Sequence, residues 1–293
     1  MKGKRRFGIF CAILAAAFYS LNSPLSKLLL DRVSATMMAG LLYIGAGAGL
    51  LCVHLAQRAS GRAPREQRLS RKELPYAIGM ILLDIAAPIC LMVGLSRSTA
   101  ANAALLNNFE IVATSLIALL IFHERISPRL WLGIALVTLS SAILSVEDAA
   151  SFTFSTGSLF VLLACTCWGL ENNCTRMMSA KSPTQIVIIK GFFSGTGSIL
   201  IALMRGEGFP DASGIACALL LGFVAYGLSI LFYIYAQRFL GAARTSAYYA
   251  VAPFLGAGLS LALFRTPPTA PFLVALAIML AGAIVVTRDS MDA

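Results

Sequence analysis

Long apolar segments recur along almost the whole sequence, and they constrain the fold more than any other feature. About 20 apolar residues in a helix cross the hydrocarbon core of a bilayer. Because lipid offers the backbone no hydrogen bonds, a chain of such segments is expected to fold as a bundle of transmembrane helices. We predict an all-α polytopic protein with ten helices, at residues 8–30, 34–56, 73–95, 99–122, 129–146, 157–178, 184–204, 212–236, 243–264 and 269–287.

The composition agrees with a protein that sits in a lipid bilayer. Of the 293 residues, 58% are hydrophobic and only 12% are charged, whereas about 25% of the residues are charged in soluble domains. The net charge of +10 would suit nucleic acid, but basic residues do not alternate with aromatic ones on a polar surface. We therefore expect no nucleic-acid binding and attribute the excess to cytoplasmic loops, which are rich in Lys and Arg.

The seven cysteines predict neither disulfides nor a metal centre. Their number is odd and nearly all lie inside apolar segments, where they act as small hydrophobic side chains. Cys165 and Cys167 fall on different faces of a helix, which is poor geometry for metal ligands. We expect no metal and no other cofactor. The basic stretch Met1–Arg6 precedes an apolar run too long for a signal peptide, so the first helix is expected to be retained.

The basic residues predict how the chain is oriented. If the N-terminus is cytoplasmic, seventeen Lys and Arg residues fall in cytoplasmic segments and five fall outside. Short cytoplasmic loops are enriched in these residues, so we expect a cytoplasmic (inner) membrane protein with both termini in the cytoplasm. The seventeen are Lys2, Lys4, Arg5, Arg6, Arg58, Arg62, Arg65, Arg68, Arg71, Lys72, Arg125, Arg129, Arg176, Lys181, Arg238, Arg244 and Arg288, and the five are Lys27, Arg32, Arg97, Arg205 and Arg265.

An internal repeat relates the two halves of the sequence. At an offset of 149 residues the first predicted helix aligns with the sixth, so that Tyr19 meets Trp168 and Asn22 meets Glu171. At an offset of 142 the fourth aligns with the ninth, and Phe122 meets Phe264. Such self-similarity is typical of duplicated architectures.

The number of helices in each repeat decides how the halves are arranged. Each half, 1–148 and 149–293, contains five predicted helices, so the second enters the membrane from the opposite side and is inverted. Inverted repeats are typical of secondary transporters, which bind solute between the repeats near the middle of the membrane. We therefore predict a central cavity. Glycine-rich runs at 45–49 and 191–197 are expected to allow close helix packing, or else to act as gating hinges.

Two stripes of polar and aromatic residues have matching positions in the halves. The helical spacing places the members of each stripe on one face of a helix. Polar groups at membrane depth need a partner or an aqueous cavity, so we interpret the stripes as opposite walls of one solute site. The alternative is hydrogen bonding between helices without any solute. The stripes are Tyr19, Asn22, Ser23 and Ser26, and Trp168, Glu171, Asn172 and Thr175.

Four charged residues lie at apparent membrane depth within the predicted helices. They are Asp84, Glu110, Glu171 and Lys190. A carboxylate at this depth could carry a coupling proton, and the alternative is a structural ion pair, for example between Lys190 and Glu171 or Glu110. The predicted substrate-binding set also includes Asn107 on the helix of Glu110, Tyr226 at the position equivalent to Asp84, and Tyr249 at the position equivalent to Asn107.

Three motifs resemble the EamA-type members of the drug/metabolite transporter superfamily. The first runs from Phe109–Glu110 to Glu124–Arg125–Ile126–Ser127 and Trp131–Leu132–Gly133. The second and third are Trp168–Gly169–Leu170–Glu171–Asn172–Asn173 and Lys190–Gly191. The resemblance implies ten helices around a central cavity, alternating access, and export or exchange of small metabolites. The family often has Glu-Pro in both the fourth and ninth helices, whereas each half here keeps one member, Glu110 or Pro253.

These observations favour a secondary transporter, and an exporter in particular, for a small polar or amphipathic metabolite such as an amino acid. The driving force is expected to be a proton gradient or solute exchange, and the oligomeric state a monomer or weak dimer. The alternatives are a membrane receptor or scaffold, or an intramembrane enzyme that uses one of the buried carboxylates. No nucleophile elbow, phosphate-binding loop or zinc motif is present, so we expect no enzymatic activity.

Overall fold

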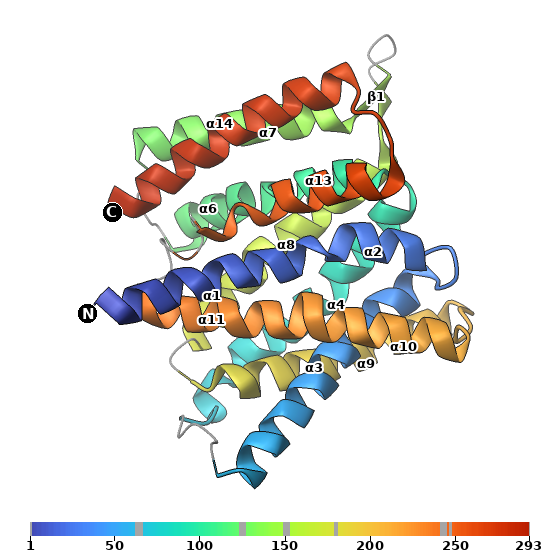
Figure 1. Cartoon of the computed structure of the whole chain (residues 1–293), viewed down its shortest axis with the longest axis vertical. Coiled ribbons are helices and arrows are strands. Elements are labelled where there is room, and N and C mark those ends of the chain that lie inside the picture. Colours follow the sequence, from blue (N-terminus) through green and yellow to red (C-terminus); the bar gives the residue numbers. More distant parts are fainter. Residues whose placement is uncertain are drawn as a thin grey trace.

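The computed structural model describes residues 2–61, 67–122, 127–148, 153–178, 181–240, 245 and 248–292. Figure 1 shows that the chain folds into a bundle of helices, with α1 beginning and α14 ending on the same side. The helices are α1 (Lys2–Ser20), α2 (Asn22–Leu29), α3 (Ala35–Ala59), η1 (Arg71–Glu73), α4 (Leu74–Ser96), α5 (Ala100–Leu106), α6 (Phe109–Phe122), α7 (Pro128–Ser145), α8 (Thr156–Met178), α9 (Pro183–Met204), α10 (Ala212–Leu221), η2 (Gly222–Leu228), α11 (Ser229–Leu240), α13 (Ala252–Phe264) and α14 (Ala270–Asp292).

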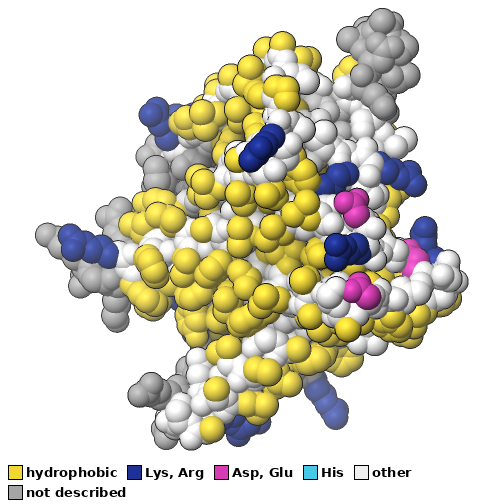
Figure 2. Space-filling model, turned by 45° about the vertical axis from the view of Figure 1, so that its right-hand side comes forward, with side chains coloured by type: hydrophobic (Ala, Val, Ile, Leu, Met, Phe, Trp, Pro, Cys, Tyr) yellow, Lys and Arg dark blue, Asp and Glu magenta, His cyan; other side chains and the backbone are white. Residues whose placement is uncertain are grey.

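Within the described residues, six helical stretches are long and apolar enough to cross a membrane, which agrees with the predicted polytopic helical membrane protein. They are Arg6–Leu29, Ala35–Ala59, Arg71–Ser96, Pro128–Ser145, Pro183–Met204 and Ala212–Leu240, and shorter apolar helices cover Ala252–Phe264 and Ala270–Val286. In Figure 2 hydrophobic side chains cover much of the visible face, and the acidic side chains in view lie on its right-hand side. Large apolar side chains such as Leu82 and Phe193 are more than half exposed, as lipid-facing residues must be.

One short sheet departs from the predicted all-α fold. Strand β1 (Val146–Asp148) pairs antiparallel with β2 (Thr153–Phe154), at the connection between the two predicted halves. The pairing satisfies backbone groups in a stretch that follows α7 and precedes α8. The predicted Glu124–Arg125–Ile126 turn, and the basic residues Arg62, Arg65, Arg125 and Arg244, lie outside the described residues.

Several predicted helices are interrupted rather than continuous. The first breaks at Leu21, and the fourth breaks at Asn107–Asn108 between α5 and α6. The eighth passes through the π-helical segment η2. A turn at Ala250–Val251 precedes α13, where Pro253 lies in the first helical turn and needs no hydrogen bond. The interruptions in the fourth and ninth segments fall at nearly equivalent positions, as is common where transporters bind solute.

The chain turns between the last two helices, as expected from the predicted spans 243–264 and 269–287. Helix α13 ends at Phe264 and α14 starts at Ala270. Arg265 has a left-handed backbone conformation with φ of 50°, and Pro267 cannot continue a helix.

The largest helix contacts join a helix of the first predicted half, 1–148, with a helix of the second, 149–293. The main pairs are α3 with α9, α4 with α8, α7 with α14, and α1 with α11, and α13 lies against α1 and α5. The predicted close packing of the glycine-rich runs is confirmed, because a methyl group at Gly191 would overlap the backbone of Gly47. This contact brings α9 against α3 at the residue next to Lys190.

Candidate functional site

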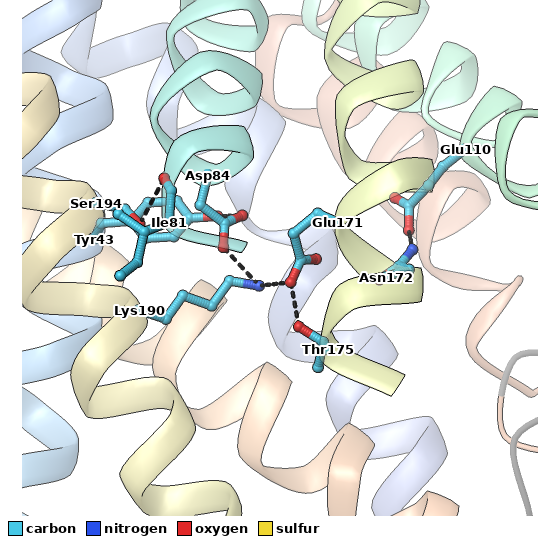
Figure 3. A network of polar contacts seen from close by, with 9 residues as sticks. All are labelled: Tyr43, Ile81, Asp84, Glu110, Glu171, Asn172, Thr175, Lys190 and Ser194. Carbon is cyan, nitrogen blue, oxygen red and sulfur yellow. Dashed lines mark hydrogen bonds and ion pairs between the residues drawn. The ribbon is translucent and has the colours of Figure 1, made fainter. Parts of the chain in front are cut away.

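A buried ion network joins four helices in the middle of the bundle (Figure 3). The Nζ atom of Lys190 on α9 lies 3.0 Å from Oδ2 of Asp84 on α4 and 3.0 Å from Oε1 of Glu171 on α8. The hydroxyl of Thr175, one turn further along α8, also donates to Oε1 of Glu171. Tyr43 on α3 donates to Oδ1 of Asp84 at 2.8 Å. We call these five residues the ion network.

The ion network is sealed from solvent. Asp84 is fully buried, Glu171 is 2% exposed and Lys190 is 6% exposed. Charges removed from water are stabilised only by close partners, and here two carboxylates share one ammonium group. If all three groups are ionised, the network carries one net negative charge. An arrangement of this kind can bind a proton or a cation, which would neutralise the excess negative charge.

Local sequence explains how Asp84 and Lys190 come to face each other. Helix α4 continues through Pro88, whose missing N–H leaves the backbone carbonyl of Asp84 without its usual helical partner. Gly191 lets α9 approach α3 closely, so the adjacent Lys190 reaches the side chains on α4 and α8. Polar groups therefore concentrate where α3, α4, α8 and α9 meet.

A hydrogen-bonded pair of a carboxylate and an amide, Glu110 and Asn172, lies beside the network. Asn172 on α8 donates to Oε1 of Glu110 at 2.6 Å, and Glu110 remains partly exposed. Glu110 lies in the first turn of α6, where the helix dipole favours a negative charge. The neighbours Glu171 and Asn172 thus have different partners, one inside the ion network and one at the end of α6 (Figure 3).

Tyrosine rings from several helices form a continuous chain next to Glu110. Ring centroids are 5.2 Å apart for Tyr43 and Tyr226, 6.0 Å for Tyr226 and Tyr19, 5.9 Å for Tyr19 and Tyr249, and 4.9 Å for Tyr249 and Tyr233. The chain starts at the sealed Tyr43 and Tyr226 and ends at rings that are partly exposed. We call Tyr19, Tyr226, Tyr249 and Glu110 the aromatic site.

Amide and hydroxyl groups on α2 connect to this site through hydrogen bonds. Asn22 donates to the hydroxyl of Tyr226 at 3.2 Å, and Ser26 donates to Oδ1 of Asn22 at 3.0 Å. Ser23 is buried on the same helix. The thiol of Cys165 lies 3.9 Å from Oδ1 of Asn107. The predicted stripe on the first helix is thus tied to the eighth predicted helix.

The structure brings most of the predicted site residues together. Asp84, Glu171 and Lys190 meet in the ion network; Glu110 contacts Asn172; Trp168 is buried next to the Tyr43 hydroxyl; and Tyr19, Asn22, Tyr226 and Tyr249 are neighbours.

The suggested ion pairs had mixed outcomes. Lys190 forms the suggested pair with Glu171. It does not form the suggested pair with Glu110, which binds Asn172 instead. The second carboxylate partner of Lys190 is Asp84. Tyr43 was not predicted, although a hydroxyl in an apolar segment was a usable signal.

Two further features describe the chemistry available here. All seven cysteines are free thiols. Within the described ranges, no group of three or more His, Cys, Asp or Glu side chains is arranged to hold a metal ion.

Comparison with known proteins identifies the family. A profile of the EamA-like transporter family matches residues 6–146 and again 155–288. The chain is 26% identical, over 90% of its length and 81% of the relative, to an "uncharacterized transporter" of Methanothermobacter thermautotrophicus. It also resembles a protein of known crystal structure, with a TM-score of 0.67, 18% identity, and coverage of 100% of this chain and 99% of the other. The chain therefore belongs to the EamA-like transporter family of the drug/metabolite transporter superfamily.

Proposed function

We propose that this protein is a secondary transporter that exports a small polar or amphipathic metabolite, such as an amino acid, across the cytoplasmic membrane. The observation that carries the proposal is the ion network, which connects Asp84 in the first half with Glu171 and Lys190 in the second half. A buried network that links two halves must rearrange when the halves move, so it can couple their movement to binding.

The proposed mechanism is alternating access of two inverted halves, 1–148 and 149–293, with ten membrane spans and both termini in the cytoplasm. The helix pairs support it. Exchanging the first half for the second turns the pair α4 and α8 into the pair α11 and α1, and maps the pairs α3 with α9 and α7 with α14 onto themselves. The two separate family matches support the same division, and the excess of basic residues in the proposed cytoplasmic segments supports the orientation.

The charge of the ion network suggests how transport is driven. With two carboxylates and one lysine, the network has one negative charge more than its lysine can balance. A proton taken up by Asp84 or Glu171 would remove that excess, and its release on the other side would complete a coupled cycle. Solute exchange without protons would leave the network in one charge state.

Transport by purified protein in liposomes tests the proposal. Vesicles are loaded with a panel of radiolabelled amino acids and related metabolites, and efflux is measured with and without a pH gradient. We expect efflux of at least one solute that is absent from protein-free vesicles. Absence of any protein-dependent flux, in both orientations of the gradient, would contradict the proposal.

The variant Glu171→Gln tests the role of the network in the same vesicles. Lys190 would still be paired with Asp84, so the protein should fold, but the second carboxylate could no longer exchange charge. We expect transport to be lost. The matched control is Glu73→Gln, which removes a carboxylate paired with Lys181 outside this network and should transport normally. Full activity of Glu171→Gln with an unchanged pH dependence would remove Glu171 from the mechanism.

A further inference from the structure

The three carboxylates inside the bundle differ in the number and charge of their protein partners. Asp84 and Glu171 both lie 3.0 Å from Lys190, and each also accepts a hydrogen bond from a hydroxyl group. Glu110 has one neutral partner, Asn172, on Oε1. Among the described side chains, none donates a hydrogen bond to Oε2 of Glu110 or forms an ion pair with it. One carboxylate oxygen therefore lacks a protein partner.

The position of Glu110 shows that it is an interior group. Tyr19 of α1, Tyr226 of η2 and Tyr249 before α13 lie within electrostatic range of its carboxylate, so elements from distant parts of the sequence converge near it. Glu110, Tyr19 and Tyr249 nevertheless keep partial exposure. Part of the surface of Glu110 and of the two rings is therefore left uncovered by the protein's own side chains.

The chemistry of this surface selects the charge of its ligand. A cation is attracted by a carboxylate and by the faces of tyrosine rings, and such aromatic cages are used to bind ammonium groups. An anion would be repelled by Glu110. Lys190 is the cation within electrostatic range of Glu110, but it is already paired with Asp84 and Glu171 and so would not offset this repulsion. A neutral ligand would leave the free oxygen of Glu110 desolvated and unpaired.

We propose, building on the transport function above, that the aromatic site recognises an organic cation: an ammonium group held by Glu110 and the tyrosine faces, on an apolar body that packs against the rings. The ion network then serves for coupling rather than for direct recognition of the substrate. Glu110 sets the charge preference, and the rings of Tyr19 and Tyr249 set the preference for an apolar body.

Three probes with the same phenyl body and different charge test the proposal. They are 2-phenylethylamine (cation), 2-phenylethanol (neutral) and phenylacetate (anion). Binding is measured in detergent, without a membrane or a gradient, through the fluorescence of Trp168 in a Trp131→Phe background. The chain has two tryptophans, and Trp131 is 48% exposed on α7. We expect the cation to bind about tenfold more tightly than either analogue.

Variants separate the contributions of charge and ring. Glu110→Gln should abolish the preference for the cation, while Glu73→Gln should leave it unchanged. Tyr249→Phe keeps a ring and should retain cation binding, whereas Tyr249→Leu should weaken it. If a variant does not fold, the comparison of the three probes on the Trp131→Phe protein still decides the question.

The outcomes distinguish this inference from the proposed function. Equal binding of the three probes, no binding of any of them, or an unchanged cation preference in Glu110→Gln would overturn the organic-cation site, even if the liposomes transport another solute. Cation binding that depends on Glu110, in a protein without any flux in liposomes, would support the site and contradict transport.

Discussion

The ion network and the aromatic site lie side by side, yet their charged groups differ in partners and in burial. In the ion network each charged group has a partner on another helix, and all are almost completely buried. In the aromatic site Glu110 has a neutral amide partner and stays partly exposed among the tyrosine rings. We infer from this difference that the ion network holds α3, α4, α8 and α9 together, whereas the aromatic site leaves a carboxylate and ring surface for the proposed ligand.

Removal of Lys190 should reduce the stability of the protein the most. The variant Lys190→Met leaves Asp84 and Glu171 buried without their cation, and breaking a buried pair costs about 3–5 kcal/mol. We expect a large fall in the thermal unfolding temperature of the detergent-solubilised protein, or loss of folded protein. Lys181→Met is the control, since Lys181 lies 3.7 Å from Glu73 near the surface and such pairs contribute about 0–1 kcal/mol. Equal stability of the two variants would show that the ion network is not structural.

Removal of the Tyr43 hydroxyl should have an intermediate effect. Tyr43→Phe deletes the 2.8 Å hydrogen bond to Asp84 and leaves a buried carboxylate oxygen without this donor, which costs about 1–3 kcal/mol. Tyr76→Phe serves as a control because Tyr76 is 37% exposed and lies on α4, the helix that carries Asp84. Thermal unfolding monitored by size-exclusion chromatography measures both variants. A Tyr43→Phe protein as stable as the Tyr76→Phe control would mean that the hydrogen bond adds nothing.

Neutralisation of Glu110 should affect stability much less. In Glu110→Gln the side-chain oxygen can still accept the hydrogen bond from Asn172, so we expect the free energy of unfolding to change by less than about 1 kcal/mol. Chemical or thermal unfolding measures the change. A loss as large as that of Lys190→Met would erase the distinction between the two regions.

A carboxylate outside the membrane spans should give the smallest effect, and one that depends on pH. Partial burial alone would raise the pKa of Glu207, but hydrogen bonds from Ser34 (2.6 Å) and the Met37 backbone N–H (3.0 Å), with the charge of Arg205, hold the pKa below its ordinary value. Its stabilisation is therefore complete above the unfolded pKa and is lost as the pH falls through the folded pKa.

The variant Glu207→Gln checks this sign. We expect a slightly lower unfolding temperature than wild type at neutral pH, and a difference that shrinks on acidification. A difference that grows as the pH falls would contradict the linkage. Because Glu207 belongs to neither region, the variant should leave cation binding at the aromatic site unchanged.

The sequence predicted a polytopic bundle of apolar helices because lipid imposes both the length and the composition of such segments. The turn at Arg265–Pro268 was predictable for the same local reason, since proline cannot continue a helix. The interruptions at Leu21 and Asn107–Asn108 were not predictable from the sequence. Tertiary contacts between helices decide where the backbone can depart from regular helical hydrogen bonding. The ion pair of Lys190 with Asp84 depends on how α4 and α9 pack, which periodicity within one helix does not reveal.

The most direct test of the two-region account is the rise in unfolding temperature that 2-phenylethylamine produces, because a ligand that binds only the folded state stabilises it by mass action. Tyr43→Phe should start from a lower unfolding temperature and show the same rise as wild type. Glu110→Gln should start near wild type and show none. A Glu110→Gln protein that keeps the rise, together with a Tyr43→Phe protein that loses it, would contradict the account.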